Sequence, residues 1–428
     1  MGADVCYKHS APTEQSNART DDSLREMSHA YGVLIVPMDD SIIEQAFADL
    51  LAWCRKRDFA GYDPFDALNS RVFQSTPLNH SRTARLIWTQ AIKRFPLNLR
   101  PLALVPPQKN SKGLALFALA TLATYRRVKT IEAETDARAL LDDLSRARIQ
   151  GYSGASWGYN FAWQSRNFFA PQGTPMIVPT AFAARALIEG HQAFGDDAYL
   201  QMARSSCNFI LSDLKRTIDT KEEVCFSYSP SDSTQIFNAS LLAAEILASV
   251  GALTRETALC DLALRAVRYV VHRQGEDGSW AYGAETGQRW IDNFHSAYVL
   301  LSLGRIAKSC VGANTELNNA LQRGYTFWRE CFFLADGWPK YYHDSLYPAD
   351  AHAAATAIIT LLEFRTLDSG ALPLAETIAA WTIRNLRDAR GFFYYQRRRF
   401  YTVHTPYMRW TQGWMLYALA RLLEEEKK

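Results

Sequence analysis

The sequence predicts an all-α protein whose fold is an (α/α)6 toroid of six helical hairpins. The first observation is a repeat: five segments between residues 134 and 425 each contain a charged helix, a turn rich in Trp and Tyr, a loop and a more apolar helix. The second is a common register, because one polar position near the start of the apolar helix recurs at spacings of 58, 57, 57 and 60 residues. Those positions are Thr180, Asn238, His295, His352 and Gln412.

An earlier apolar helix, 112–127, fits as the first copy of the repeat, with Lys112 in the register position. The apolar helices are rich in Ala and Leu on nearly all faces, which predicts an inner, buried ring. The charged helices carry one apolar stripe at spacings of three and four residues, which predicts an outer ring. These outer helices are expected at 80–96, 134–149, 196–217, 256–274, 315–331 and 374–388.

The N-terminal region is expected to differ from the ring. Residues 1–30 are polar, lack an apolar leader and are predicted to be disordered. Residues 31–428 are predicted to form one toroid domain, with 31–79 as its helical extension. The seven cysteines are odd in number and form no CxxC pair, which indicates reduced thiols and a cytoplasmic protein.

Composition excludes several classes of function. The chain has 428 residues, 48% of them hydrophobic, so it can bury a large core. With 47 basic and 44 acidic residues, the overall charge gives no reason to expect a nucleic-acid partner or a strongly charged membrane-binding surface. The sequence contains no run of about 18 apolar residues, so no membrane span is predicted. Nucleotide-binding and serine-hydrolase motifs are also missing, and no cofactor is expected.

Loop lengths predict where a binding site would lie. Connections from an inner helix to the next outer helix are short, whereas those from outer to inner helices, such as 150–178 and 389–407, are long. The long loops therefore share one end of the toroid with the polar register residues. We expect a cavity there with polar groups at its floor and aromatic residues at its rim.

The catalytic candidates are His295 and His352, which occupy the same register in successive repeats and have Asp292 and Asp350 close before them. The alternative is that these four residues have structural roles. Asp at a helix start caps free backbone amides, and a buried His often only forms a hydrogen bond within the core. A zinc site built from these four residues is not predicted, because two separate repeats would have to supply it.

Asn238 and Tyr228 complete the catalytic set. Tyr and His can transfer a proton next to a carboxylate whose charge Asn or Arg stabilises, which is the chemistry of polysaccharide lyases and epimerases. Hydrolysis by an Asp pair is the nearest alternative, with Asp63, Asp66 and Asp232 as further candidates. A glycan-binding protein without catalysis is another.

Further residues are predicted to bind substrate, because aromatic faces stack on sugar rings and polar groups contact hydroxyls and carboxylates. They are Tyr62, Asp63, Trp157, Tyr159, Trp163, Arg166, Asp232, Trp280, Tyr282, Trp338, Tyr341, Arg409, Trp410 and Gln412.

Two resemblances to known families also bear on fold and function. The stretch 265–283 resembles the QxxDGxW element of terpenoid cyclases and protein prenyltransferases, which use α/α toroids, but the DxDD motif of the cyclases is missing. A terpenoid cyclase-like protein therefore stays an alternative. The second resemblance rests on 61–70, 100–116, 156–169, 226–244, 290–303 and 405–419, which resemble the VpsJ-type polysaccharide biosynthesis family.

That second resemblance implies an exopolysaccharide context and supplies no catalytic residue. Together with the site candidates it predicts a carbohydrate-active enzyme, a lyase or epimerase acting on an anionic exopolysaccharide or its precursor. The expected partners are a poly- or oligosaccharide and other polysaccharide-assembly enzymes.

Overall fold

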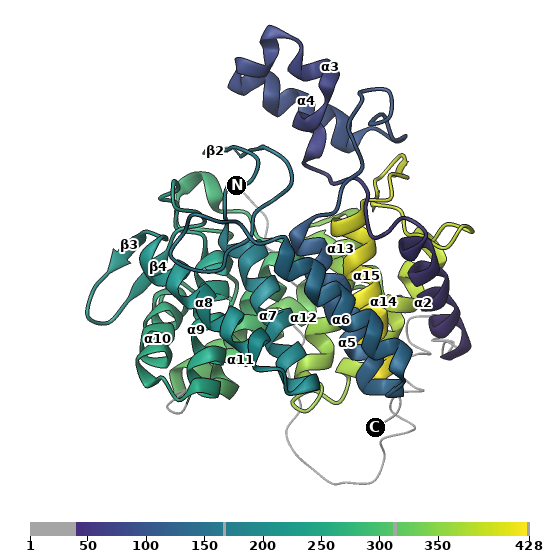
Figure 1. Ribbon diagram of the computed structural model, residues 1–428. Helices are drawn as coiled ribbons and strands as arrows, with labels where there is room; N and C mark the ends of the chain where they lie inside the picture. The colour runs from purple at the N-terminus through teal and green to yellow at the C-terminus, as the bar shows by residue number, and fades with distance from the viewer. Residues whose placement is uncertain (1–39, 166–167, 311–314, 426–428) are drawn as a thin grey trace, which may run out of the picture.

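The computed structural model describes residues 40–165, 168–310 and 315–425 (Figure 1). The predicted disordered segment 1–30 lies outside these residues. Six inner helices form a closed ring, in which each packs on the next and the last, α15, packs on the first, α5. They are α5 (Ser111–Val128), α7 (Ile177–Phe194), α9 (Phe237–Thr254), α11 (Asn293–Ser309), α13 (Ala351–Phe364) and α15 (Trp414–Glu425). The predicted (α/α)6 toroid is confirmed.

Six further helices surround the ring. Five lie where the sequence predicts outer helices: α6 (Ile131–Arg146), α8 (Asp197–Ser212), α10 (Thr257–Val271), α12 (Thr315–Cys331) and α14 (Ala371–Leu386). The sixth is α2 (Asp40–Arg55), which packs against α15 and α14. Its buried residues Ile43, Ala46, Leu50 and Cys54 form the one-sided stripe that an outer helix needs.

The prediction that 80–96 is the first outer helix is wrong. That stretch forms α4 (Arg82–Arg94), which projects from one end of the toroid with η1 (Asp66–Asn69), α3 (Arg71–Gln74) and η2 (Pro77–His80) (Figure 1). Its apolar stripe packs instead on a separate small cluster of Ala67, Ile92, Ala103 and Val105. Periodicity alone cannot distinguish a stripe that faces the ring from one that faces a local cluster.

The two ends of the toroid differ as predicted. Inner helices lead to the next outer helix through short turns, while the long loops lie at the other end, and four of them contain short antiparallel strands. The strands are β1 (Trp163–Gln164), β2 (Phe169–Ala170), β3 (Arg216–Asp219), β4 (Val224–Phe226), β5 (Lys340–Tyr342), β6 (Ser345–Asp350), β7 (Gln396–Arg397) and β8 (Thr402–Val403).

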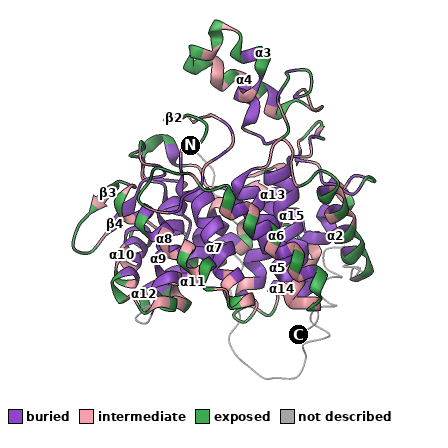
Figure 2. Cartoon of the chain, in the orientation of Figure 1, coloured by how far each residue is buried: buried purple, intermediate pink, exposed green. Residues whose placement is uncertain are grey.

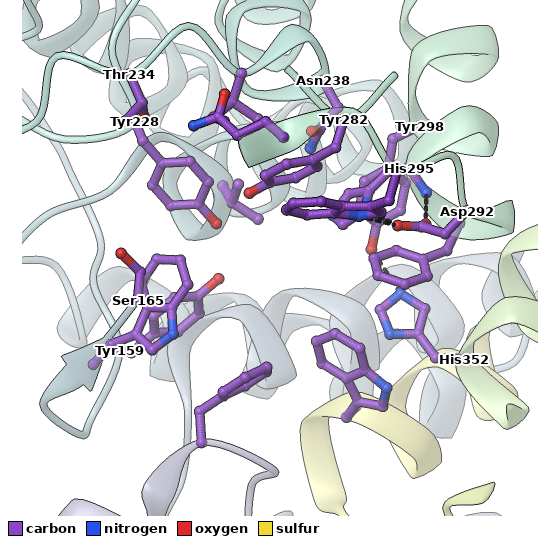
Figure 3. A pocket seen from close by; sticks show the side chains of 18 of the residues that line it. Tyr159, Ser165, Tyr228, Thr234, Asn238, Tyr282, Asp292, His295, Tyr298 and His352 are labelled. Carbon is purple, nitrogen blue, oxygen red and sulfur yellow. Dashed lines mark hydrogen bonds and ion pairs between the residues drawn. The ribbon is translucent and has the colours of Figure 1, made fainter. Parts of the chain in front are cut away.

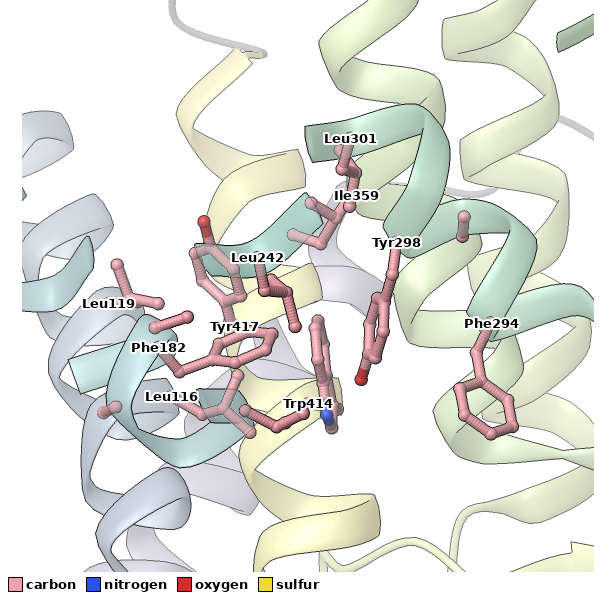
Figure 4. Packing of buried hydrophobic residues seen from close by; sticks show 14 of the residues in the cluster. Leu116, Leu119, Phe182, Leu242, Phe294, Tyr298, Leu301, Ile359, Trp414 and Tyr417 are labelled. Carbon is pink, nitrogen blue, oxygen red and sulfur yellow. The ribbon is translucent and has the colours of Figure 1, made fainter. Parts of the chain in front are cut away.

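Side chains fill the middle of the barrel. Phe182, Leu242, Tyr298 and Trp414, from four different inner helices, meet near its axis (Figure 4). The ring of Trp414 stacks on Tyr298 with centroids 5.7 Å apart and meets Phe182 edge-on at 5.3 Å. Figure 2 shows the same pattern for the whole chain, with buried residues on the inner helices and exposed ones on the outer helices and the projecting element. The toroid therefore has a packed core and is not an open channel.

Buried ion pairs link the inner helices on the short-turn side of this core. Glu245 on α9 accepts hydrogen bonds from Arg185 on α7 at 2.9 and 2.8 Å, from Ser302 at 2.8 Å and from Arg305 at 3.2 Å. Its relative exposure is 2%. Burial acts to raise the pKa of Glu245, but the neighbouring guanidinium groups outweigh it and lower the pKa. This cluster ties three consecutive inner helices together.

One helix among the described residues, α9, is long and apolar enough to cross a membrane by length and composition. Of that window, 78% is buried inside the toroid, as expected for a core helix.

Candidate functional site

A cavity of about 430 Å³ opens at the long-loop end of the toroid. Its floor is formed by the first residues of inner helices, and its walls by the loops before α7, α9, α11 and α13. The projecting helix α4 reaches over it with Leu86, Gln90 and Lys93. Figure 3 shows side chains from these elements converging on one space. This size suits a small ligand or one end of a longer chain.

The repeat register brings four of its six residues to this cavity. Lys112, Asn238, His295 and His352 line it, each within the first three residues of its helix. The same place in the repeat gives the same place around the ring, so residues spaced by about 57 positions converge on one space.

Two register residues serve the backbone instead. The Thr180 hydroxyl accepts from the amide of Trp157 at 2.9 Å. The amide group of Gln412 pairs with the backbone of Phe393 in both directions, at 2.8 Å each. Gln412 was predicted to bind substrate, and the structure gives its side chain a structural role: it holds the last long loop.

His295 and Asp292 form a hydrogen-bonded dyad at the start of α11. Oδ1 of Asp292 accepts from the backbone amide of His295 at 3.0 Å, and Oδ2 lies 2.7 Å from its Nδ1 (Figure 3). Because a carboxylate can only accept, Nδ1 carries a proton, and in the neutral ring the lone pair is then on Nε2. Trp290 donates its indole N–H to Oδ2 at 3.0 Å and so fixes the carboxylate. The side chain of His295 remains 21% exposed.

His352 has a different environment. It is only 1% exposed, and its Nε2 lies 2.7 Å from the hydroxyl of Tyr298. Lys112 donates to the same hydroxyl at 3.2 Å, so a buried line runs from Lys112 through Tyr298 to His352. Burial, together with the positive charges of Lys112 and Arg409, holds the pKa of His352 well below its ordinary value, so the ring is neutral. His352 thus acts on the cavity chiefly through Tyr298.

Three tyrosine hydroxyls point into the cavity from successive loops: those of Tyr159, Tyr228 and Tyr282 (Figure 3). Burial raises the pKa of Tyr228 well above its usual range, so its phenol is protonated and can donate. Tyr282 stacks on Trp290 with ring centroids 4.5 Å apart and lies 4.5 Å from the ring of His295. The amide oxygen of Asn238 is buried without a hydrogen-bond partner among the described residues.

The predicted aromatic residues divide into two groups. Trp163, Tyr341 and Trp410 line the cavity. The cavity is not lined by Trp157, Trp280 or Trp338. Each of them donates its indole N–H to a backbone carbonyl, of Leu144, Val270 and Leu346 respectively. Their predicted role in substrate binding gives way to a structural one. In these three repeat turns, the Trp clamps the loop to a neighbouring segment of backbone.

Most of the predicted carboxylates are also structural. Asp350 caps α13 by accepting from the amides of His352 and Ala353 at 2.8 and 3.3 Å. Asp232 accepts from the amide of Tyr228 at 3.1 Å and holds a turn. Neither lines the cavity, which corrects their assignment to catalysis and substrate binding.

The predicted contacts near the projecting element have mixed outcomes. Arg409 lines the cavity, but its guanidinium is held from behind by Asp63, one of the bonds being 2.7 Å long. Asp63 and Tyr62 line a separate small cavity beside it. Burial acts to lower the pKa of Arg409, but the buried ion pair with Asp63 outweighs it and raises the pKa above its ordinary value. Arg166 lies outside the described residues.

Two lysines line the cavity. Lys112 is buried at the floor, and burial lowers its pKa well below the ordinary value. Lys93 stands at the mouth, 4.3 Å above the ring centre of Phe65 and 5.6 Å from that of Trp410. Burial lowers the pKa of Lys93 to about 8. Neither lysine forms an ion pair with a carboxylate within the described part of the chain.

Sequence reasoning missed Tyr298, Lys93 and Lys112 as site residues. Tyr298 follows His295 by three positions, which places both on one face of the helix, so spacing could have found it. Lys112 occupies the register position, so the repeat alignment could have found it as well. Lys93 could not be found, because its place over the cavity depends on how the projecting element folds. Among the described residues, no group of three or more His, Cys, Asp or Glu side chains could hold a metal ion.

Comparison with known proteins shows the fold. No protein-family model matches the chain, and no curated protein matches it. The resemblance to the VpsJ-type family therefore stays a resemblance. Solved structures do match at low identity. A sugar epimerase from a ruminal bacterium is 12% identical with a TM-score of 0.61, and the match covers 91% of this chain and 100% of that one.

Two other structures match over similar lengths. An unsaturated glucuronyl hydrolase specific for heparin is 14% identical with a TM-score of 0.59, covering 91% of this chain and 98% of that one. Cellobiose 2-epimerase from Bacillus thermoamylovorans is 13% identical with a TM-score of 0.58, covering 74% and 88%. The toroid of this chain is the fold of these sugar-active enzymes.

Proposed function

We propose that this protein is a carbohydrate-active enzyme that moves a proton at a carbon atom of a bound sugar, as epimerases and lyases do. The observation that carries the proposal is the Asp292–His295 dyad, in which Nδ1 faces the carboxylate and Nε2 is left to act as a base in an aromatic cavity. A base of this kind needs a partner that fixes its tautomer and stabilises the imidazolium, and Asp292 does both.

The reaction would begin with removal of the proton from the carbon next to a carbonyl or carboxylate group by Nε2 of His295. The C–H electron pair then moves toward that group, and negative charge develops on its oxygen. The hydroxyls of Tyr228 and Tyr282 and the amino group of Lys112 line the same cavity and can donate to this oxygen. Return of a proton to the opposite face from a second donor, such as a cavity tyrosine, completes an epimerisation. Departure of the oxygen substituent on the next carbon, which leaves as an alcohol with the proton taken up by His295, completes an elimination.

Hydrolysis by a carboxylate pair is supported less well. Glycosidases use two carboxyl groups, one on each side of the glycosidic bond. Among the described residues that line the cavity, Asp292 is the one with a carboxyl group, and both of its oxygens are occupied by hydrogen bonds.

An anionic sugar fits the charge of the cavity. Lys93 and Lys112 face it without carboxylate partners among the described residues, and burial lowers the pKa of both, so a uronate or another acidic sugar would stabilise their charged forms. The volume favours one or two rings at the end of a chain over a long polymer lying in a groove. The VpsJ-type resemblance supports an exopolysaccharide or its precursor as the source, and assembly enzymes of that polymer as partners.

The test is a product assay on a panel of neutral and acidic oligosaccharides. Epimerisation gives a new sugar isomer by NMR, elimination gives a product with a new C=C bond, and hydrolysis gives new reducing ends. We expect one of the first two, with acidic sugars preferred. Hydrolysis products would replace the proposal with the glycosidase alternative. Binding of a sugar without turnover under any condition would favour a non-catalytic glycan-binding protein.

A further inference from the structure

The projecting element, residues 66–105, has an unusual surface. Of the eighteen exposed large hydrophobic side chains in the described chain, seven belong to it. These are Val72, Leu78, Ile87, Phe95, Leu97, Leu102 and Leu104. Leu97 is 62% exposed and Leu102 79% exposed. Exposed apolar groups concentrated on one small element mark a contact surface for something apolar.

The charge of this element is equally one-sided. No Asp or Glu occurs between Asp66 and Glu132, although the chain as a whole is nearly balanced. Residues 67–105 contain six basic side chains, of which Arg100 is buried against Asp66. Arg71, Arg82 and Arg94 are exposed. The even overall charge thus conceals a local surface that is both basic and apolar.

A second segment extends the same surface. The tip between β7 and β8 has the sequence Arg397–Arg398–Arg399–Phe400–Tyr401, in which Phe400 is 86% exposed. This tip lies beside the end of α4, because the amide of His404 donates to the carbonyl of Pro96 at 2.9 Å. Two segments about 300 residues apart in sequence therefore bring exposed aromatic or aliphatic side chains and arginines to one end of the molecule (Figure 1).

We propose that this end of the protein docks on an anionic lipid bilayer. Exposed Leu, Ile and Phe side chains can enter the boundary between headgroups and acyl chains, while arginines pair with lipid phosphates. A folded protein partner would supply acidic side chains for the arginines but would need a fitted surface. Binding to a bilayer requires only positive charge and exposed apolar side chains, and the two segments have both.

The docking surface lies at the mouth of the cavity. Leu86, Gln90 and Lys93 on α4 line the cavity, while Ile87 on the same helix is 64% exposed on its outside. Docking would therefore hold the cavity mouth at the membrane. If the proposed function is correct, a sugar carried on a lipid would meet the cavity there.

The test uses the full chain and vesicle co-sedimentation, so it needs no activity and can fail independently of the proposed function. The vesicles contain phosphatidylcholine alone or phosphatidylcholine with phosphatidylglycerol. The double variant Leu97→Ser/Phe400→Ser removes two exposed side chains from the docking surface. Its matched control, Ile131→Ser/Leu367→Ser, removes side chains that are 86% and 78% exposed at the short-turn end.

We expect the wild-type protein and the control to sediment with anionic vesicles and not with neutral ones, less so at high salt. The docking variant should lose at least fivefold in bound fraction. Equal loss in both variants, binding to both lipids alike, or no sedimentation of the wild type would overturn the proposal. So would a wild-type dimer that only the docking variant converts to monomer, because a second copy would then be the occupant.

Discussion

The hydroxyl of Tyr298 lies 2.7 Å from Nε2 of His352. This hydrogen bond distinguishes His352 from His295, which occupies the same position in the preceding repeat. His352 uses Nε2 inside the protein, whereas His295 uses Nδ1 on Asp292 and keeps Nε2 free of partners among the described residues. The repeat delivers both rings to one cavity. Under the proposed function, this difference gives proton transfer to His295 and the positioning of Tyr298 to His352.

The first prediction concerns His295→Gln. We expect activity to fall by about 10²–10⁴-fold, the usual contribution of a general base. The free energy of unfolding should change little, because the side chain is partly exposed and Asp292 still caps the helix. The matched control is His272→Gln, which removes a surface histidine that pairs with Glu223. A His295→Gln protein with full activity would remove the base from the proposed mechanism.

The second prediction concerns His352→Ala. Because His352 is buried and bonded to Tyr298, we expect the free energy of unfolding to drop by about 1–3 kcal/mol for the unpaired hydroxyl, with a further loss for the space left behind. Denaturant titration measures this change. Unaltered stability would mean that His352 is not the positioning residue described above. Tyr298→Phe should share part of the loss, since it breaks the same bond.

The third prediction concerns the ion-pair cluster below the core. Glu245→Gln leaves Arg185 and Arg305 without their buried carboxylate, and we expect a cost of about 3–5 kcal/mol. Glu134→Gln breaks a half-exposed pair with Arg138 and should cost less than about 1 kcal/mol. Similar losses in both variants would show that the cluster does not hold the inner ring together.

The fourth prediction concerns pH. The pKa of Lys93 is about 8 in the folded protein, below its ordinary value of 10.5, because the side chain is buried. Between these two values the unfolded chain holds more protons than the folded one, so the Lys93 contribution to the free energy of unfolding rises with pH. The difference in stability between wild type and Lys93→Met should therefore shift in favour of wild type from about pH 8 to about pH 10.

The same lysine predicts how binding depends on pH. Affinity for an acidic sugar should fall as the pH rises through about 8, because Lys93 then loses the charge that attracts it. Calorimetric titration of wild type and Lys93→Met measures this fall. An equal pH dependence in both proteins would place the relevant charge elsewhere.

Much of the fold could be predicted from the sequence because the same pattern of a charged helix, an aromatic turn and an apolar helix recurs in each repeat. Each inner helix is apolar on nearly all faces, and the register residues lie near the helix starts, so one alignment locates Asn238, His295 and His352 together. The error over 80–96 has the opposite cause. An apolar stripe such as Trp88 and Ile92 shows that one face of the helix is buried, but tertiary structure decides which element covers that face.

The site could be predicted less completely than the fold. Asp292 and Asp350 look alike in sequence, since both cap an inner helix. Only coordinates show that Asp292 also reaches the ring of a histidine, while Asp350 reaches Gln396. The repeat tryptophans were misassigned for a similar reason, because the direction of an indole N–H depends on side-chain rotamers.

The most direct test of the proposed proton transfer by His295 is deuterium exchange into the sugar. The wild-type protein, His295→Gln and His272→Gln are each incubated with an acidic oligosaccharide in D2O, and NMR follows the hydrogen on the carbon next to the carbonyl or carboxylate. We expect deuterium to enter at that carbon with wild type and His272→Gln, and at least about 100-fold more slowly with His295→Gln, within the range expected for a lost base. Exchange at the wild-type rate in His295→Gln, or formation of an epimer by wild type without deuterium at that carbon, would contradict the proposed role of His295.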